Sequence, residues 1–209
     1  MRTVTALIVT YNRSECLMKL LDALITQNQE LQRIVIFDNN STDKTTNSLK
    51  QEGYMTATAI EKNRIYICKK NNTEIVFFKN LKNTGGSGGF YSGMKLANSF
   101  GSDYIWCMDD DVLPDNDCLE KMMASFSRDV AIVIPNRSSN YFNDSAIVDL
   151  NLKNPFLFRL GMQKKIVSSI DIKSTAIEVV DMSFEGPLIK SDIIKKVGYP
   201  NKEFFILFD

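Results

Sequence analysis

The stretch Tyr104–Asp111, YIWCMDDD, runs from five largely apolar residues into three consecutive acids. An apolar run of this length predicts a buried strand, so the three carboxylates stand where that strand ends. Adjacent carboxylates repel and raise each other's pKa, and a hard divalent cation such as Mg²⁺ or Mn²⁺ is the usual compensation. A solvated acidic turn is the alternative for the triplet alone. The metal site is therefore a hypothesis that the rest of the chain must support.

Strands and helices alternate before this stretch. Val4–Thr10 is an apolar run of strand length, and apolar residues then recur at helical spacing from Leu17 to Ile25, with Ser14 placed as the N-cap. Arg33–Phe37 predicts a second buried strand, and residues 45–52 predict a short helix. Apolar strands separated by helices indicate an α/β fold with a mainly parallel central sheet flanked by helices.

The remaining elements are expected in chain order. They are an edge strand at 65–68, a turn at 71–72, a strand at 74–79, a helix at 90–100, the strand that ends in the acids, a helix at 116–126, a strand at 130–135, a long loop at 136–163, an antiparallel pair at 164–172 and 175–180, and a helix at 191–197 closed by Gly198. The antiparallel pair places a small antiparallel element in the C-terminal half.

Composition excludes several classes of function. The chain of 209 residues has 25 basic and 25 acidic residues, so no global field favours nucleic acid. Its four cysteines lack the paired spacing of a zinc site or a disulfide framework. No stretch approaches the roughly 20 apolar residues of a membrane helix, and no signal peptide begins the chain, so we expect a cytoplasmic protein. With no histidine, acid/base chemistry must fall to carboxylates.

Polar segments follow three of the predicted strands. They are Thr10–Arg13 after the first, Asp38–Asp43 after the second, and Asp109–Asp111. In a parallel α/β sheet, ligands bind beyond the carboxyl ends of the strands, so these segments should meet at one cleft. Asp38 could accept a hydrogen bond from a base or a ribose hydroxyl. A helix cap or an Asx-turn is the alternative for Asp38, and it is the favoured interpretation of Asp43.

A glycine-rich segment, Asn83–Gly89 with the sequence NTGGSGG, precedes the predicted helix at 90–100. It is not a P-loop, because no Lys-Ser/Thr follows, and it is not a dinucleotide-binding fingerprint, which would follow the first strand. Its glycines would allow a sugar or diphosphate to approach the backbone closely. A flexible turn is the alternative.

Four ordered motifs together resemble glycosyltransferase family 2. They are LIVTYNR from Leu7, DNNSTD from Asp38, NTGGSGGF from Asn83 and MDDD from Met108, and the resemblance covers essentially the whole chain. The glycine motif paired with the acid triplet is most similar to galactofuranosyltransferases and their rhamnosyltransferase-like relatives. The resemblance implies the GT-A fold, a nucleotide-sugar donor, a divalent metal and inversion at the anomeric carbon.

The resemblance also implies roles for individual residues. Thr10 and Asp38 match positions that contact the nucleoside, Asp109 and Asp111 match the Asp-x-Asp motif, and Asp209 falls where the family keeps its catalytic base. The donor contacts expected on this basis are Thr10, Tyr11, Asn12, Arg13, Asp38, Asn83, Gly85, Gly86, Gly88, Gly89, Asp109 and Asp110, with Asp109 and Asp111 as ligands of Mn²⁺ or Mg²⁺. Because the chain stops inside the apolar run 204–208 followed by Asp209, we expect one GT-A domain truncated at its C-terminus, with 1–111 as the nucleotide-binding half and 112–209 as the acceptor-side half.

The expected activity is transfer of a sugar, galactofuranose or rhamnose, from a UDP- or dTDP-linked donor to a polysaccharide or lipid-linked acceptor. Such an acceptor would place the protein at the inner face of the membrane by peripheral association. Two rivals remain. A nucleotidyltransferase would want a glycine-rich basic loop after the first strand, which Thr10–Arg13 does not provide. A nucleotide-sugar-binding module without turnover would be separated from an enzyme by a transfer assay.

Overall fold

The computed structural model describes residues 2–56, 59–139, 142–143, 145–151, 153–154, 164–168, 176–180 and 184–205. Contacts divide the chain into two compact units. The larger consists of Met1–Val133 and Glu185–Asp209, and the smaller of Ile134–Phe184. Each unit is described separately below, and every predicted site residue belongs to the larger one.

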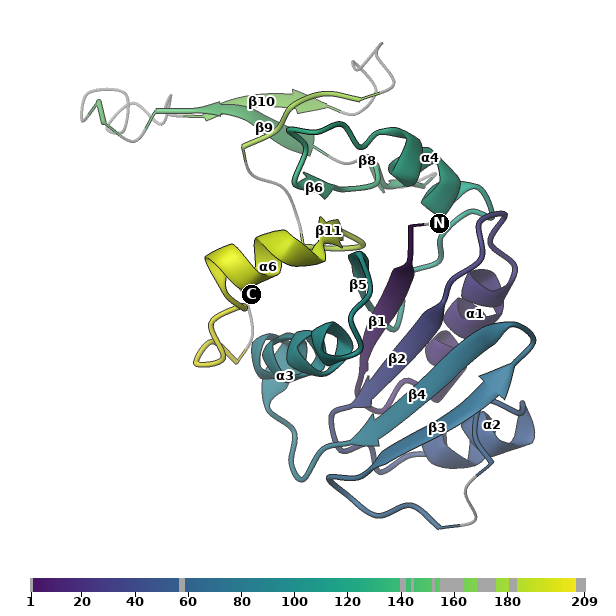
Figure 1. Ribbon diagram of the computed structural model, residues 1–209. Coiled ribbons are helices and arrows are strands. Elements are labelled where there is room, and N and C mark those ends of the chain that lie inside the picture. The colour runs from purple at the N-terminus through teal and green to yellow at the C-terminus, as the bar shows by residue number, and fades with distance from the viewer. Residues whose placement is uncertain are drawn as a thin grey trace. The chain divides into compact units, whose positions relative to one another are not determined.

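The larger unit is a seven-stranded sheet with helices on both faces (Figure 1). Its strands are β1 (Val4–Thr10), β2 (Arg33–Asp38), β3 (Ile65–Lys70), β4 (Thr73–Lys79), β5 (Tyr104–Asp109), β6 (Ile132–Val133) and β11 (Leu188–Lys190). Its helices are α1 (Ser14–Ile25), α2 (Thr45–Gln51), α3 (Gly85–Ser99), α4 (Cys118–Ala124) and α6 (Ser191–Val197).

The order of strands in the sheet is β3-β4-β2-β1-β5-β11-β6. The four central strands, β4, β2, β1 and β5, are parallel to one another. Strands β3, β11 and β6 pair antiparallel with their neighbours. The mainly parallel sheet predicted from the sequence is therefore confirmed. Every residue of β1 and β2 is buried, which is why both strands read as continuous apolar runs.

The two faces of β1 pack against different helices. Val4, Ala6 and Ile8 join a core that includes the leucines of α1 and Leu49 of α2. The opposite face, which carries Leu7, packs against α3. Figure 1 shows α1 and α2 on one side of the sheet and α3 on the other. This alternation of side chains follows from the two-residue period of a strand.

Helix α3 begins inside the predicted glycine loop, which corrects the expected start at residue 90. A Cβ on Gly88 would lie 2.6 Å from Thr84 Cβ, one on Gly89 would lie 2.6 Å from Val9 Cγ1, and one on Gly93 would lie 2.9 Å from Leu7 Cδ1. These distances are shorter than van der Waals contact. The glycines therefore let α3 lie directly on β1, and the segment is a packed helix start, not a flexible turn.

Other boundaries also differ from those expected. Ser14 is the first residue of α1 and not its N-cap. Helix α4 and strand β6 are shorter than the predicted 116–126 and 130–135. Helix α6 ends at Gly198 as predicted, and this residue has a φ of 92°, which favours glycine.

The smaller unit contains two antiparallel strand pairs. Strands β7 (Ser138–Ser139) and β8 (Phe142–Asn143) pair, as do β9 (Ser145–Leu150) and β10 (Lys164–Ser168). The predicted strand at 164–172 exists in part, but its partner is β9, within the segment expected to be a loop, and not residues 175–180. Val180 instead donates its N–H to the carbonyl of Ile147. The small antiparallel element in the C-terminal half is confirmed.

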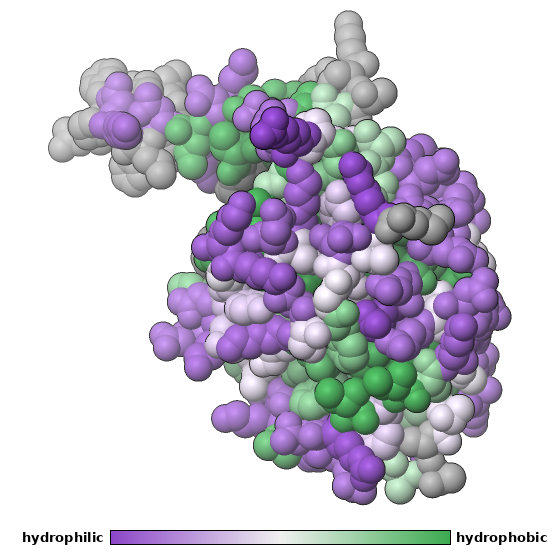
Figure 2. Space-filling view, in the orientation of Figure 1, coloured by the Kyte–Doolittle hydropathy of each residue, from purple (hydrophilic) through white to green (hydrophobic). Residues whose placement is uncertain are grey.

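Strand β3 forms the edge of the large sheet, as predicted, and leaves apolar side chains in solvent. Its residues alternate between exposed and half-buried, with Ile65 44% and Ile67 54% exposed. Figure 2 shows hydrophobic surface over β3 and β4. The lysines Lys69 and Lys70 at the end of β3 discourage pairing with another chain.

Candidate functional site

The chain changes direction across the sheet between β1 and β5. It runs from β1 outward through β2 to β4 on one side, and then returns through α3 to β5 on the other side of β1. Such a switch point leaves a crevice at the carboxyl ends of the two strands. The two strands end at nearly the same level, because Asp109, the last residue of β5, lies opposite Val9, the residue before the end of β1. The segments Thr10–Arg13 and Asp109–Asp111 are therefore brought together.

Asp110 is the acid that ties these two segments to each other. Its carboxylate is only 4% exposed and accepts hydrogen bonds from Thr10 Oγ1 at 2.7 Å and from the Tyr11 N–H at 3.3 Å. Burial raises the pKa of Asp110, although these two hydrogen bonds and the charge of Arg13 act in the opposite direction. Of the three acids, Asp110 has the clearest structural role, because it fixes the end of β1 to the end of β5.

The other two acids lie nearer to solvent. The Asp111 side chain is 51% exposed, and its Oδ2 accepts from Arg13, whose guanidinium also lies 3.7 Å from Asp110 Oδ1. Asp109 is half-buried at the end of β5. Arg13 thus supplies positive charge to the acid pair in this structure, and Asp111 holds the pKa of Arg13 above its usual value.

The acids have the right chemistry for a divalent cation, but too few of them come together to enclose one. Carboxylate oxygens are hard ligands of the kind that Mg²⁺ and Mn²⁺ prefer, and Asp111 has room to receive one. Within the described ranges, however, no group of three or more acidic or cysteine side chains is placed to enclose a metal. A metal held by these acids would therefore have to take most of its coordinating oxygens from a ligand or from water.

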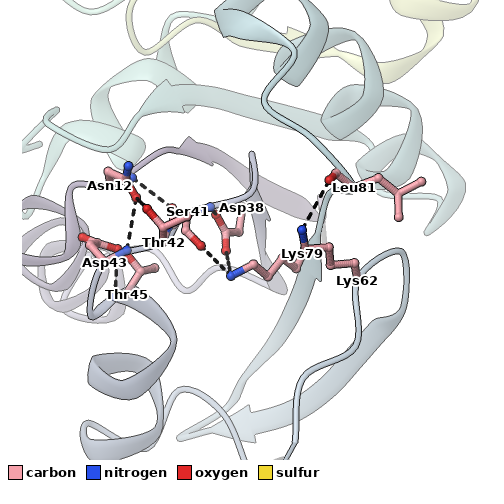
Figure 3. A network of polar contacts seen from close by, with 9 residues as sticks. All are labelled: Asn12, Asp38, Ser41, Thr42, Asp43, Thr45, Lys62, Lys79 and Leu81. Carbon is pink, nitrogen blue, oxygen red and sulfur yellow. Dashed lines mark hydrogen bonds and ion pairs between the residues drawn. The ribbon is translucent and has the colours of Figure 1, made fainter.

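Asp38, at the end of β2, lies beneath its own loop. Its side chain is 0% exposed, and Oδ1 accepts from the Ser41 N–H at 2.7 Å. Oδ2 has no hydrogen-bond partner and lies 3.6 Å from Lys79 Nζ. Lys79, the last residue of β4, also donates to the Ser41 carbonyl at 2.6 Å (Figure 3). Asp38 thus bonds its own loop locally, as the structural alternative expects, but to the residue three positions on and not two as in an Asx-turn. Its other carboxylate oxygen has no hydrogen bond.

Asn12 organises the same loop from the other side. Asn12 has a backbone φ of 55°. Its Oδ1 accepts from the Thr42 N–H at 2.7 Å and from the Asp43 N–H at 3.2 Å. Its own N–H donates to Ser41 Oγ at 2.9 Å. Figure 3 shows Asn12 pointing into the 41–43 turn. In this structure, Asn12 therefore holds the loop after β2 against the end of β1.

Asp43 caps the start of two helices, which agrees with the favoured sequence interpretation. Oδ1 accepts from the Thr45 N–H at 3.0 Å, at the start of α2, and Oδ2 accepts from the Ser14 N–H at 3.2 Å, at the start of α1. Partial burial opposes ionisation of Asp43, but the hydrogen bonds outweigh it and lower its pKa. The negative charge also lies at the favourable end of both helix dipoles.

We expect Asp43→Ala to lower the free energy of unfolding by about 1 kcal/mol at pH 7, because two helices lose a cap. Since the folded pKa of Asp43 is lowered, its contribution is present above its unfolded pKa of about 4 and is lost as the pH falls through the folded value. Urea unfolding at pH 7 and pH 3 should therefore show the difference from wild type shrinking at acid pH. Asp117→Ala is the matched control, because Asp117 precedes α4 without a side-chain cap bond and makes an exposed ion pair with Lys121, which is worth little. An equal or smaller loss for Asp43→Ala would contradict the double-cap role.

Sequence reasoning missed Asn39, which joins the loop after β2 to the start of α3. The side chain is 2% exposed, and its Nδ2 donates to Asn83 Oδ1 at 3.0 Å and to the Gly85 carbonyl at 2.8 Å. Its Oδ1 accepts from the Thr84 N–H at 3.1 Å, from Thr84 Oγ1 at 3.0 Å and from Asn80 Nδ2 at 3.2 Å. Asn80 and Thr84 were not singled out either. The sequence feature that could have revealed these residues is the run of polar residues after β4, which resembles the runs after β1 and β2.

The predicted glycine contacts are only partly open to a ligand. Gly88 and Gly89 are buried against Thr84 and Val9. The N–H of Gly86 donates to the Phe205 carbonyl at 3.1 Å. Asn83 binds Asn39 and the Gly85 N–H. The structure therefore brings the glycine segment to the same edge as the acids, but the backbone donors at its start have protein partners. Asp209, the predicted base, lies outside the described residues.

A separate groove lies at the opposite edge of the sheet. It has a volume of about 640 Å³ and is lined by Ala23, Asn28 and the segment 113–117, with Lys121. These residues surround the carboxyl end of α1, which is the amino-terminal edge of the parallel strands. None of the residues predicted to bind donor or metal lines this groove.

Among the described residues, no helix is long and apolar enough to cross a membrane.

Comparisons with known proteins agree with this architecture. The family model described as glycosyl transferase family 2 matches residues 5–177. A galactofuranosyltransferase, GlfT1 of Mycolicibacterium smegmatis, is 23% identical over 206 residues, which is 99% of this chain and 62% of that protein. The chain therefore spans less than two thirds of the length of that relative.

Solved structures of glycosyltransferases share the fold. A mannosyltransferase of Pyrobaculum calidifontis, in complex with GDP-Man and Mn²⁺, matches with a TM-score of 0.62 and 16% identity, over 97% of this chain and 49% of that one. TarS 1–349 of Staphylococcus aureus, in complex with UDP, matches with a TM-score of 0.59 and 13% identity, over 98% of this chain and 52% of that one. Identities this low establish the GT-A fold and no substrate. With the family model matching most of its length, the chain belongs to glycosyltransferase family 2.

Proposed function

We propose that the chain is an inverting glycosyltransferase, which moves a sugar from a nucleoside diphosphate donor to a hydroxyl of a polysaccharide or glycolipid. The observation that carries the proposal is the cluster at the switch point of the sheet, where Thr10, Asp110 and Arg13 join the ends of β1 and β5. The loop after β2 and the start of α3 meet at the same edge through Asn39.

The donor is proposed to lie along this edge. Thr10–Arg13 and the loop that contains Asp38 would receive the nucleoside, and the glycine segment that starts at Asn83 would lie beside the diphosphate. Asp38 can act on a ligand only if its loop opens, because its carboxylate is buried below Ser41. Arg13 is more accessible, with a side chain 54% exposed, and its guanidinium suits a phosphate geometrically.

Asp111 and Asp109 are proposed to hold Mn²⁺ or Mg²⁺. When bound, the ion would act as a Lewis acid that offsets the charge developing on the departing diphosphate. The mannosyltransferase of P. calidifontis, which binds GDP-Man with Mn²⁺, supports this choice of ion class. Asp110 would keep the two strands that carry Thr10 and the acids in a fixed relation, so that donor contacts and metal ligands stay aligned.

The transfer step needs a base for the acceptor. We assign this role to Asp209, whose carboxylate would take the proton of the acceptor hydroxyl as the oxygen bonds to the anomeric carbon. The bond from that carbon to the diphosphate oxygen breaks, and the nucleoside diphosphate leaves from the opposite face. Attack opposite the leaving group inverts the configuration at the anomeric carbon. Galactofuranose and rhamnose are the proposed sugars, and the similarity to a galactofuranosyltransferase favours the first.

Peripheral association with the inner face of a membrane is part of the proposal, because a lipid-linked acceptor would be presented there. The exposed Ile65 and Ile67 on β3 provide apolar surface for such an association. No nucleic-acid partner is proposed, since the formal net charge of +0 supplies no global attraction to phosphate backbones.

The proposal is tested by calorimetric titration of the protein with UDP, dTDP and GDP, each with and without saturating Mn²⁺. We expect one nucleotide to bind at least about ten-fold more tightly with the metal, because the acids otherwise repel the diphosphate. Binding and turnover are measured separately, since the chain spans only part of each relative's length. Failure of all three nucleotides to bind with metal would contradict donor recognition, and binding without transfer would favour a nucleotide-sugar-binding module.

A further inference from the structure

A segment near the end of the described chain, Tyr199–Phe205, lies along α3, and its last residues meet the amino-terminal end of that helix. The hydroxyl of Ser87 donates to the Asn201 carbonyl at 2.5 Å, and the Gly86 N–H donates to the Phe205 carbonyl at 3.1 Å. Both contacts join positions more than 110 residues apart along the chain, so they are tertiary contacts and not part of the helix itself. We call Tyr199–Phe205 the strap.

The glycine motif is shaped to receive the strap. Gly85 has a φ of 73°, and a Cβ there would lie 2.1 Å from the Phe205 carbonyl oxygen. Ser87 is 0% exposed, although a serine hydroxyl in a helix is ordinarily solvated or bonded to its own helix. The three residues Gly85, Gly86 and Ser87 thus supply space, a backbone donor and a buried side-chain donor to the same short segment.

Side chains hold the strap farther along α3. The Tyr199 hydroxyl accepts from Asn98 Nδ2 at 3.2 Å, and its ring meets the Tyr91 ring edge-on with centroids 5.9 Å apart. Lys202 Nζ lies 5.6 Å from the centroid of Tyr91. These contacts are independent of the glycine motif, and they show that the strap follows the helix instead of touching it at one point.

The same end of α3 is tied to the proposed donor edge. Asn39, in the loop after β2, donates to the Gly85 carbonyl, while the neighbouring Gly86 N–H and Ser87 hydroxyl donate to the strap. One helical turn therefore carries bonds to the donor side and to the chain that leads on to residue 209. A shift of the strap cannot occur without breaking bonds at this turn.

We propose that Ser87 is a positioning residue, which fixes the strap on α3 and thereby sets where the chain leading to Asp209 starts relative to the donor edge. This inference rests on the proposed function for its catalytic consequence. It gives Gly85, Gly86 and Ser87 the role of holding the acceptor-side chain, while the segment as a whole stays beside the proposed diphosphate site.

The test compares Ser87→Ala with Ser99→Ala on the same helix. The Ser99 hydroxyl donates only to the carbonyl of Leu96 within α3, so the control removes a hydroxyl without touching the strap. Amide hydrogen exchange at Gly86 and cleavage by trypsin after Lys202 report opening of the strap without any donor. We expect both rates to rise about five-fold in Ser87→Ala, which corresponds to losing one ordinary hydrogen bond, and to stay at wild-type values in the control.

Ser87→Cys separates the hydrogen bond from the space that the side chain fills. A thiol fills at least the space of the hydroxyl but is a weak donor, so the variant leaves no cavity and should still open like Ser87→Ala if the bond matters. Wild-type exchange and cleavage rates in both Ser87→Ala and Ser87→Cys would overturn the proposal.

Activity readouts distinguish this inference from the proposed function. In Ser87→Ala, affinity for UDP with Mn²⁺ should stay within two-fold of wild type, while kcat for hydrolysis of the bound UDP-sugar falls and its KM does not. A larger loss of UDP affinity would mean that Ser87 contacts the donor, which overturns a purely positioning role. If wild type binds no nucleotide, the proposed function fails, whereas the exchange and cleavage rates still decide whether Ser87 holds the strap.

Discussion

Asp111→Asn is expected to remove most of the strengthening that Mn²⁺ gives to UDP binding, a loss of ten-fold or more in affinity at saturating metal. A neutral amide is a poorer ligand for a hard cation than a carboxylate, and Asp111 is the one exposed acid of the triplet. Without metal, the variant should bind UDP at least as well as wild type, because one repelling charge is gone and Arg13 is released from its partner. Calorimetry with and without Mn²⁺ measures both quantities.

Asp192→Asn provides the matched control for this experiment. Asp192 is an exposed acid in the first turn of α6 and makes only a long ion pair with Lys196, so its neutralisation should leave both affinities unchanged. Asp109→Asn should have a smaller effect than Asp111→Asn if Asp109 lies in the outer coordination shell, and an equal effect if both acids ligate. An unchanged response to Mn²⁺ in Asp111→Asn would remove the acid triplet from the donor site.

Asn39→Ala is expected to destabilise the protein by about 3 kcal/mol and to weaken nucleotide binding as well. The side chain bonds five groups on the segment 80–85, and its loss leaves the buried Gly85 carbonyl and four half-buried groups without this partner. The loop after β2 and the start of α3 would then no longer be held together. Urea unfolding and calorimetry with UDP should therefore both change, although Asn39 need not touch the ligand.

Asn72→Ala is the control for this second change, because Asn72 is exposed and makes one surface bond to Glu30. It should alter the free energy of unfolding by less than about 0.5 kcal/mol. A cost for Asn39→Ala as small as that of the control would show that water replaces the network easily. If Asn39→Ala lowers the free energy of unfolding by the expected amount but the folded protein binds UDP with normal affinity, then Asn39 has a structural role only.

The central strands could be predicted from the sequence because their burial leaves a direct trace. Val4–Thr10 and Tyr104–Met108 are uninterrupted apolar runs, and both are buried strands in the parallel part of the sheet. Their parallel pairing followed from the helices between them. The start of α3 could not be found in this way, because glycine is a poor helix former and its value here lies in the close approach to Val9 and Thr84.

The sequence also failed to predict which strands pair when they are distant along the chain. Strand β10 was expected to pair with the segment that follows it, but it pairs with β9, which lies in a stretch rich in Asn and Ser. The sequence of β9, SAIVDL, has only three consecutive apolar residues and weak alternation, and its partner lies 14 residues away or more. Its periodicity therefore does not identify it as a strand.

The candidate site was likewise predicted only in part from the sequence. The convergence of Thr10, Asp38 and Asp109 follows from topology alone, since each ends a neighbouring parallel strand. The different contacts of the three acids do not follow from topology. Only the structure shows that Asp110 accepts from Thr10 and that Asp111 pairs with Arg13. Asn39 and Ser87 act through partners 40 or more residues away, and a sequence pattern carries no sign of such contacts.

The most direct test of the donor site uses the paramagnetism of Mn²⁺. In an amide NMR spectrum of the protein with saturating UDP, a small addition of Mn²⁺ should broaden the resonances of 10–13 and 109–111 first, because the ion is proposed to sit at the carboxyl ends of β1 and β5. Mg²⁺ at the same concentration should shift these resonances without broadening them. Broadening centred on 113–117, which lines the groove at the opposite edge of the sheet, with the acid triplet unaffected, would contradict the account.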